Sequence, residues 1–83
     1  MDYTFSNHAR QKLTEFGRSQ IRLDWIERTL SNPDYVEKYE DQNKTYHWKR
    51  INEYGNRALK VVYNHNKKPV HIITVYFDKR YNK

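Results

Sequence analysis

The 83-residue chain contains no cysteine and only two glycines and two prolines. The lack of cysteine excludes a disulfide framework, a thiol nucleophile and a thiolate metal site. No apolar run approaches the ~18 residues of a membrane-spanning helix, and residues 1–5 do not have the charged and apolar regions of a signal peptide. We therefore expect a cytoplasmic protein with a single domain, residues 1–83.

Aliphatic residues are also scarce, because Leu, Ile, Val and Phe together supply only 17 of the 83 residues. That share is close to the roughly 20% below which chains are often disordered. Eight Tyr and two Trp add large, partly apolar side chains, and the net charge is only +6. We expect a folded domain with a thin, aromatic-rich core.

Positive charge is concentrated in the second half of the sequence. Residues 1–41 carry a net charge of −2, whereas residues 42–83 carry +8. A basic segment that also contains Tyr, Trp and His is typical of a surface that binds a polyanion such as nucleic acid. The alternative is a solvated sheet edge on which lysines discourage aggregation.

Two helices are predicted in the first half. Ser6 is placed to cap a helix that runs to about Phe16, where Gly17 ends it. Ser19 is placed to cap a second helix that ends at Ser31, before Asn32-Pro33-Asp34. A very short connection would make the pair an αα-hairpin. The apolar face of the second helix is predicted to consist of Leu23, Ile26 and Leu30. Trp25 is expected to flank this face.

Alternating patterns predict strands at both ends of this hairpin. The predicted fold class is α+β, with a short N-terminal strand and a two-helix hairpin packed on one face of an antiparallel β-meander. On the last strand, we expect His71, Ile73, Val75 and Phe77 to face the helices, and Ile72, Thr74 and Tyr76 to face the open side. The predicted strands are Tyr3–Phe5, Tyr35–Tyr39, Tyr46–Ile51, Ala58–Tyr63 and Val70–Phe77.

Several short motifs occur in a familiar order. Ser6–Arg10 opens the first helix, and Asn32–Asp34 closes the second. The basic strand Trp48–Arg50 and the hydrophobic strand Leu59–Tyr63 follow, and Ile73–Arg80 ends the pattern. In order and spacing this resembles a family of small bacterial domains allied to the RelE/ParE toxins, which belong with the barnase, EndoU and colicin-type ribonucleases. The resemblance covers nearly the whole chain and implies a RelE/ParE-toxin-like fold.

The resemblance also implies RNA cleavage without a metal ion. Relatives tend to place a His on the first helix, a cation on a middle strand and a Thr or Ser on a late strand. His8, either Lys49 or Arg50, and Thr74 occupy the matching positions. Phe16-Gly17-Arg18 departs from the pattern, because many relatives have Arg at the first of these positions. The arginine at the end of this motif is then the candidate replacement.

Three residues are candidate catalytic groups. His8 is the candidate acid or base, because an imidazole titrates near neutral pH and the start of a helix favours a phosphate. Thr74 offers a hydroxyl to a phosphate oxygen, and Arg80 is the candidate donor to the transition state. The ordinary alternatives are a surface histidine, a strand threonine and a solvated arginine.

Six further residues are candidate ligands of RNA. Lysine and arginine bind phosphate, and tyrosines stack on bases. Alternation along a strand allows only one of Lys49 and Arg50 to face the site, and Trp48 is expected in the core or in a cross-strand pair. The candidate ligands are Lys12, Lys49, Arg50, Lys60, Tyr63 and Tyr76.

Other classes of site find no support in the sequence. His47, His65 and His71 do not have the spacing of a metal site. No P-loop, dinucleotide-binding or serine-hydrolase motif occurs. We expect no metal and no cofactor.

These observations lead to one principal hypothesis and two alternatives. The principal one is a metal-independent endoribonuclease of the RelE-like toxin type, which acts on RNA, mRNA in particular, on the ribosome or off it. A cognate acidic antitoxin protein is the expected partner. The first alternative is a non-catalytic nucleic-acid-binding or topoisomerase-binding (ParE-like) module of the same fold. The second is a structural interaction domain.

Overall fold

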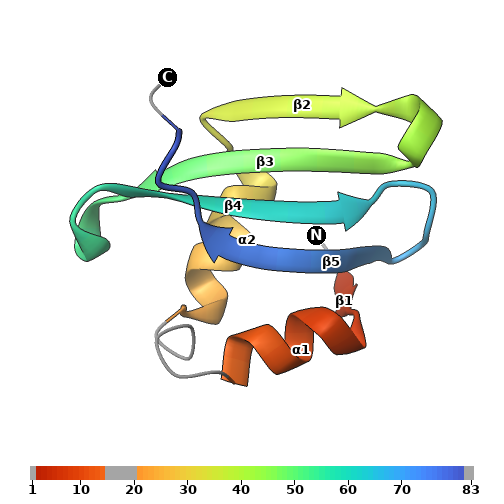
Figure 1. Cartoon of the computed structure of the whole chain (residues 1–83), viewed down its shortest axis with the longest axis horizontal. Helices are drawn as coiled ribbons and strands as arrows, with labels where there is room; N and C mark the ends of the chain where they lie inside the picture. The colour runs from red at the N-terminus through yellow and green to blue at the C-terminus, as the bar shows by residue number, and fades with distance from the viewer. Residues whose placement is uncertain (1, 15–20, 82–83) are drawn as a thin grey trace.

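The computed structural model describes residues 2–14 and 21–81 of the chain. In these residues, two helices cover one face of a five-stranded sheet in the order β1-β5-β4-β3-β2 (Figure 1). The predicted α+β class and the placement of both helices on one face are confirmed. The elements are β1 (Tyr3–Phe5), α1 (Asn7–Thr14), α2 (Leu23–Ser31), β2 (Tyr35–Tyr39), the 3₁₀ helix η1 (Glu40–Gln42), β3 (Lys44–Ile51), the 3₁₀ helix η2 (Asn52–Tyr54), β4 (Arg57–Asn64) and β5 (Val70–Phe77).

The sheet is mixed, which corrects the prediction of a purely antiparallel one. Strands β2 to β5 form the predicted antiparallel meander. Strand β1 joins its edge and runs parallel to β5, so that Tyr3 lies opposite Val70 and Phe5 opposite Ile72. A three-residue strand has too short a pattern to indicate its partner or its direction.

Ser6 connects the start of α1 to β5 through hydrogen bonds. Its hydroxyl donates to the carbonyl oxygen of Ile73 at 2.9 Å and accepts from the amide of Ala9 at 2.9 Å, while its own amide donates to Ile72 at 2.8 Å. The predicted N-cap is therefore confirmed. Ala9 is fully buried against the sheet. Phe16, Gly17 and Ser19, on which the predicted end of the first helix and start of the second depend, lie outside the described residues.

Helix α2 begins at Leu23, later than predicted, and no side chain caps it at Arg22. Leu23 is 59% exposed, which corrects its assignment to the apolar face. The buried face instead includes Thr29, whose hydroxyl donates to the carbonyl oxygen of Trp25 at 2.8 Å. That bond satisfies the hydroxyl, so that a threonine can occupy a core position. The buried side chains of α2 are Trp25, Ile26, Thr29 and Leu30.

A β-bulge changes the alternation along β5. Val62 lies opposite Thr74, but the neighbouring Tyr63 lies opposite Ile72, so Ile73 is an extra residue. Val75 and Phe77 contact the core as predicted, whereas Ile72 lies in the core and not on the open side. The predicted helix-facing positions of His71 and Ile73 are therefore wrong. The buried core between helices and sheet consists of Ala9, Ile21, Trp25, Ile26, Leu30, Ile51, Leu59, Val61, Tyr63, Ile72 and Val75.

Candidate nucleic-acid interface

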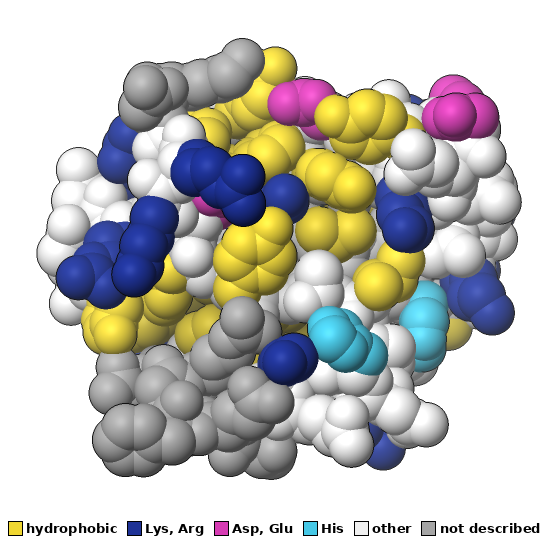
Figure 2. Space-filling view, in the orientation of Figure 1, with side chains coloured by type: hydrophobic (Ala, Val, Ile, Leu, Met, Phe, Trp, Pro, Cys, Tyr) yellow, Lys and Arg dark blue, Asp and Glu magenta, His cyan; other side chains and the backbone are white. Residues whose placement is uncertain are grey.

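The side of the sheet away from the helices carries a cluster of aromatic and cationic side chains. We call this side the open face. It is drawn toward the viewer in Figure 2, where Lys and Arg side chains surround a band of hydrophobic ones. Alternation places the members on β3, β4 and β5 opposite the core positions of the same strands, and Tyr35 and Tyr81 join them through ring contacts with Trp48. The open face comprises Tyr35, Tyr46, Trp48, Arg50, Lys60, Thr74, Tyr76 and Tyr81.

Lys60 on β4 lies at the centre of this cluster. Its ammonium nitrogen is 4.5 Å from the ring centre of Tyr46 and 5.3 Å from those of Trp48 and Tyr76. It also donates a hydrogen bond of 3.0 Å to the hydroxyl of Tyr76. Strand register explains the grouping, since Trp48, Lys60 and Tyr76 lie opposite one another on β3, β4 and β5. The result is a positive charge held among aromatic rings.

Trp48 connects this cluster to the segment that follows β5. Its indole nitrogen donates to a carboxylate oxygen of Asp78 at 3.0 Å, and its ring stacks on Tyr81 with centres 5.9 Å apart and planes 16° from parallel. Arg50 lies over the Tyr81 ring at 5.2 Å, and Tyr35 lies beside Trp48 at 5.4 Å. Trp48 is only 6% exposed, as expected, and it makes the predicted cross-strand pair.

Asp78 is the carboxylate of this site, and it is charged at neutral pH. Partial burial by itself would raise the pKa of Asp78, but the hydrogen bonds from Trp48 and from the Arg80 amide lower it. The nearby charges of Lys60 and Arg80 act in the same direction. The net result is a pKa below the usual aspartate value.

The structure distinguishes the two predicted cations of β3. Arg50 points to the open face, where its guanidinium donates to the backbone carbonyl of Asn56 at 3.2 Å. Lys49 lies on the helix-covered side, and its ammonium is 3.5 Å from Asp34. Arg50 is therefore the cation available to a ligand on the open face. Lys12 lies half-buried on α1.

The three predicted catalytic residues occupy separate elements. Thr74 lies on β5 opposite Val62, Arg80 is exposed just after β5, and His8 is exposed in the first turn of α1. Within residues 2–14 and 21–81, no hydrogen bond or ion pair joins any two of them. The Ser6 contacts to Ile72 and Ile73 bring the start of α1 beside the middle of β5.

Tyr63 is on the wrong side of the sheet for the stacking role predicted from the sequence. It is 8% exposed in the core, and its hydroxyl lies 3.1 Å from the Nε2 atom of His47. The Nδ1 atom of His47 lies 3.0 Å from the carbonyl oxygen of Thr29, which can only accept. Nδ1 must therefore carry the proton, and Nε2 accepts from Tyr63. His47 is thus a structural link between β3, β4 and α2.

Burial of His47 predicts a pH dependence of stability. Desolvation lowers the pKa of His47, against a smaller opposing effect of its bond to Thr29. The unfolded chain then takes up a proton near pH 6.5 that the folded chain does not, so the free energy of unfolding should fall as the pH drops below about 6.5. Urea titrations between pH 7 and 5 should show this slope, and His47→Gln should reduce it. An equal slope in both proteins would contradict the assignment.

Sequence reasoning missed Asp78 and Tyr81 as parts of the site. Both follow the last predicted strand, in a stretch with no alternation. The pair Asp78 and Trp48 is separated by 30 positions, and no pattern in the sequence relates them. Tyr46 carried a usable signal, because it is two residues from Trp48 on a strand and therefore shares its face.

The described residues contain no group of three or more His, Asp or Glu side chains arranged to hold a metal ion. No helix in the described segments has the length and apolar character needed to cross a membrane.

Comparison with known proteins identifies a family to which this chain is similar. Residues 5–77 match the family described as "Domain of unknown function (DUF4258)". Neither a curated protein nor a solved structure matches the chain. The matched segment runs from the end of β1 to the end of β5 and so includes nearly all of the fold and of the open face. The chain therefore belongs to the DUF4258 family.

Proposed function

We propose that the protein binds single-stranded RNA on its open face and acts as a metal-independent endoribonuclease of the RelE-like toxin type. The observation that carries the proposal is the position of Lys60 among the rings of Tyr46, Trp48 and Tyr76. Proteins that bind single strands combine cations for the phosphates with aromatic rings for the bases. The open face offers both on rigid neighbouring strands.

The charges around the cluster support a polyanionic ligand. Arg50 and Arg80 lie at one end of the open face, and the only acidic residue after Glu53 is Asp78. Asp78 is bound to Trp48 and to the Arg80 amide. Binding through phosphates releases counterions, so the affinity for RNA should fall steeply with salt.

The proposed cleavage uses the residues suggested by the family resemblance. His8 takes the proton of the 2′-hydroxyl, and the 2′-oxygen forms a bond to phosphorus as the bond to the 5′-oxygen breaks. The 5′-oxygen takes a proton from solvent, and a 2′,3′-cyclic phosphate remains. Thr74 and Arg80 donate to the phosphate oxygens as negative charge develops. The proposed protein partner is an acidic antitoxin that covers the same cations, and the proposed location is the cytoplasm.

Incubation of the purified protein with a single-stranded RNA in EDTA tests the cleavage. The expected result is cleavage by the wild type and a loss of about 100-fold or more in rate for His8→Gln, because general acid–base groups typically contribute that much. Thr74→Val and Arg80→Gln should also slow it. Lys67→Gln, in the β4–β5 turn at the other end of the sheet, is the matched control. No cleavage by the wild type, or equal cleavage by all variants, would contradict the catalytic proposal.

A non-catalytic RNA-binding module is the second candidate function. The specific observation in its favour is that no bond joins His8, Thr74 and Arg80 in the described residues. RNA binding that depends on salt, without cleavage, would select this function. A topoisomerase-binding, ParE-like module would instead change DNA supercoiling on expression and leave RNA intact.

A further inference from the structure

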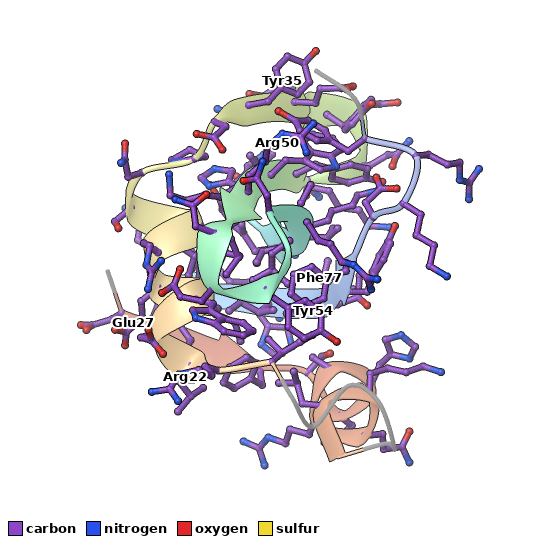
Figure 3. The ribbon with its side chains drawn as sticks, turned by 90° about the vertical axis from the view of Figure 1, so that its left-hand side faces the viewer. Arg22, Glu27, Tyr35, Arg50, Tyr54 and Phe77 are labelled. Atoms are coloured by element: carbon purple, nitrogen blue, oxygen red, sulfur yellow. The ribbon has the colours of Figure 1, made fainter. Side chains whose placement is uncertain are left out.

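A pocket of about 290 Å³ lies at the end of the open face. The end of β3, the start of β4 and the segment after β5 form its walls, and Figure 3 shows the labelled Arg50 and Phe77 on this side of the molecule. Its size is near the lower end of the ~300–1,000 Å³ range of small-ligand sites. The residues that matter for its chemistry are Arg50, Arg57, Phe77, Asp78, Lys79 and Tyr81.

The pocket has an excess of positive charge. Three cationic side chains line it, Arg50, Arg57 and Lys79, against the single carboxylate of Asp78. Figure 2 shows Lys and Arg side chains gathered at this end of the face. Both oxygens of Asp78 already accept hydrogen bonds, from the Trp48 indole and from the Arg80 amide. The lining therefore has a net charge of +2, which is complementary to a dianion.

The other carboxylates near this end of the sheet are engaged elsewhere. Glu53 accepts two bonds from Arg28, at 3.0 and 2.8 Å, and these lower the pKa of Glu53 to about 2. Asp34 accepts from the backbone amide of Arg50 at 2.9 Å and lies near Lys49. Neither lines the pocket. Within the described residues, neither forms an ion pair with the guanidinium of Arg50 or Arg57.

The arginines retain hydrogen-bond donors for a ligand. A guanidinium has five N–H donors, and that of Arg50 donates to one backbone carbonyl, at Asn56. Arg57 is exposed and lies over the ring of Tyr54 at 5.5 Å, and no carboxylate in the described part of the chain is bonded to it. Two arginines on one pocket are suited to the planar, bidentate recognition of a phosphate.

We propose that this pocket binds a terminal phosphomonoester, such as the phosphate at one end of an RNA strand. A phosphomonoester carries about two negative charges at neutral pH, whereas an internal phosphodiester carries one, so the net +2 of the lining favours the terminal group. The volume exceeds that of a phosphate alone and leaves space for the attached ribose. The inference that the phosphate belongs to an RNA strand rests on the proposed function. The inference that the pocket binds a phosphomonoester does not depend on that function.

Adenosine 5′-monophosphate and adenosine are the first probes, with amide NMR shifts as the readout. We expect the monophosphate to shift the amides of residues 57–58 and 77–79, and adenosine not to do so. Arg57→Gln and Lys79→Gln should each weaken this binding about tenfold or more, because each removes a charge-assisted contact to the phosphate. Lys67→Gln is the charge-matched control and should bind as the wild type does. Equal shifts with both probes, or binding unchanged in both pocket variants, would overturn the proposal.

RNA oligonucleotides with a 5′-phosphate, a 3′-phosphate or two hydroxyl ends identify the source of the group. One phosphorylated end should bind more tightly than the unphosphorylated strand, and Arg57→Gln should remove that difference. Phosphomonoester binding in the pocket without any RNA binding on the open face would support the pocket and reject the proposed function. RNA binding that is identical for all three strands, together with no monophosphate shifts, would reject the pocket and retain the function.

Discussion

Replacement of Lys60 by methionine is expected to weaken RNA binding by about tenfold or more, which corresponds to ~1.4 kcal/mol. Methionine keeps an unbranched chain on the strand but removes the ammonium, which is 4.5 to 5.3 Å from three aromatic rings. The expected loss includes a phosphate contact and the cation–aromatic contacts to the three rings. The free energy of unfolding should change by about 1 kcal/mol or less, since a cation–aromatic contact at an accessible site contributes about that much.

Salt titrations of the same variant separate electrostatics from packing. If Lys60 neutralises one phosphate, the slope of log affinity against log salt should fall by about one. Lys67→Met removes an equal charge from an exposed turn and should leave affinity and slope close to those of the wild type. Wild-type affinity in Lys60→Met would place the RNA elsewhere on the molecule.

Replacement of the neighbouring residue, Leu59, by alanine is expected to have the opposite effect: it should lower the free energy of unfolding and leave RNA affinity unchanged. Leu59 is fully buried between the helices and the sheet. Truncation of a buried leucine to alanine typically costs about 2–5 kcal/mol, because it removes apolar contacts and leaves a cavity. In so small a domain, that is a large share of the total stability. Urea unfolding should show the loss, while RNA affinity per folded molecule stays unchanged.

Leu59→Val is the milder variant, with an expected cost of about 1 kcal/mol for one lost methylene. It covers the case in which Leu59→Ala does not fold. A stable Leu59→Val protein that loses RNA affinity would show that the two faces of β4 are not functionally separate, against our account. Unchanged stability in both variants would contradict the position of Leu59 in the core.

Much of the secondary structure could be predicted from the sequence because the local signals were strong. The Ser6 cap and the bounds of β2 and β5 agree with the structure. The parallel pairing of β1 depends on contacts 67 positions away, such as Thr4 with His71. Short segments carry no information about partners that distant in the sequence.

The faces of the strands were harder to predict than the strands themselves. The extra residue Ile73 shifts the alternation in β5. Both alternating sets of side chains in this strand contain apolar residues, so the sequence does not indicate which set faces the core. His47 has a polar side chain, yet it occupies a core position because Thr29 and Tyr63 satisfy both ring nitrogens. A single sequence does not reveal such partners.

The candidate site was predicted in part. Arg50, Lys60 and Tyr76 lie on the open face because charged and aromatic residues alternate with core residues on β3, β4 and β5. Tyr63 was misassigned because an aromatic residue fits a core or a stacking surface equally well. The contribution of Tyr81 arises from tertiary stacking on Trp48, after the last strand.

The two tryptophans allow the central claim to be tested in one titration. Trp48 lies on the open face with its indole N–H bonded to Asp78, whereas Trp25 lies on α2 in the core on the other side of the sheet. In a ¹H–¹⁵N spectrum, addition of single-stranded RNA should move the indole signal of Trp48 and leave that of Trp25 in place. Movement of the Trp25 signal alone, or of neither signal while RNA is bound, would contradict the assignment of RNA binding to the open face.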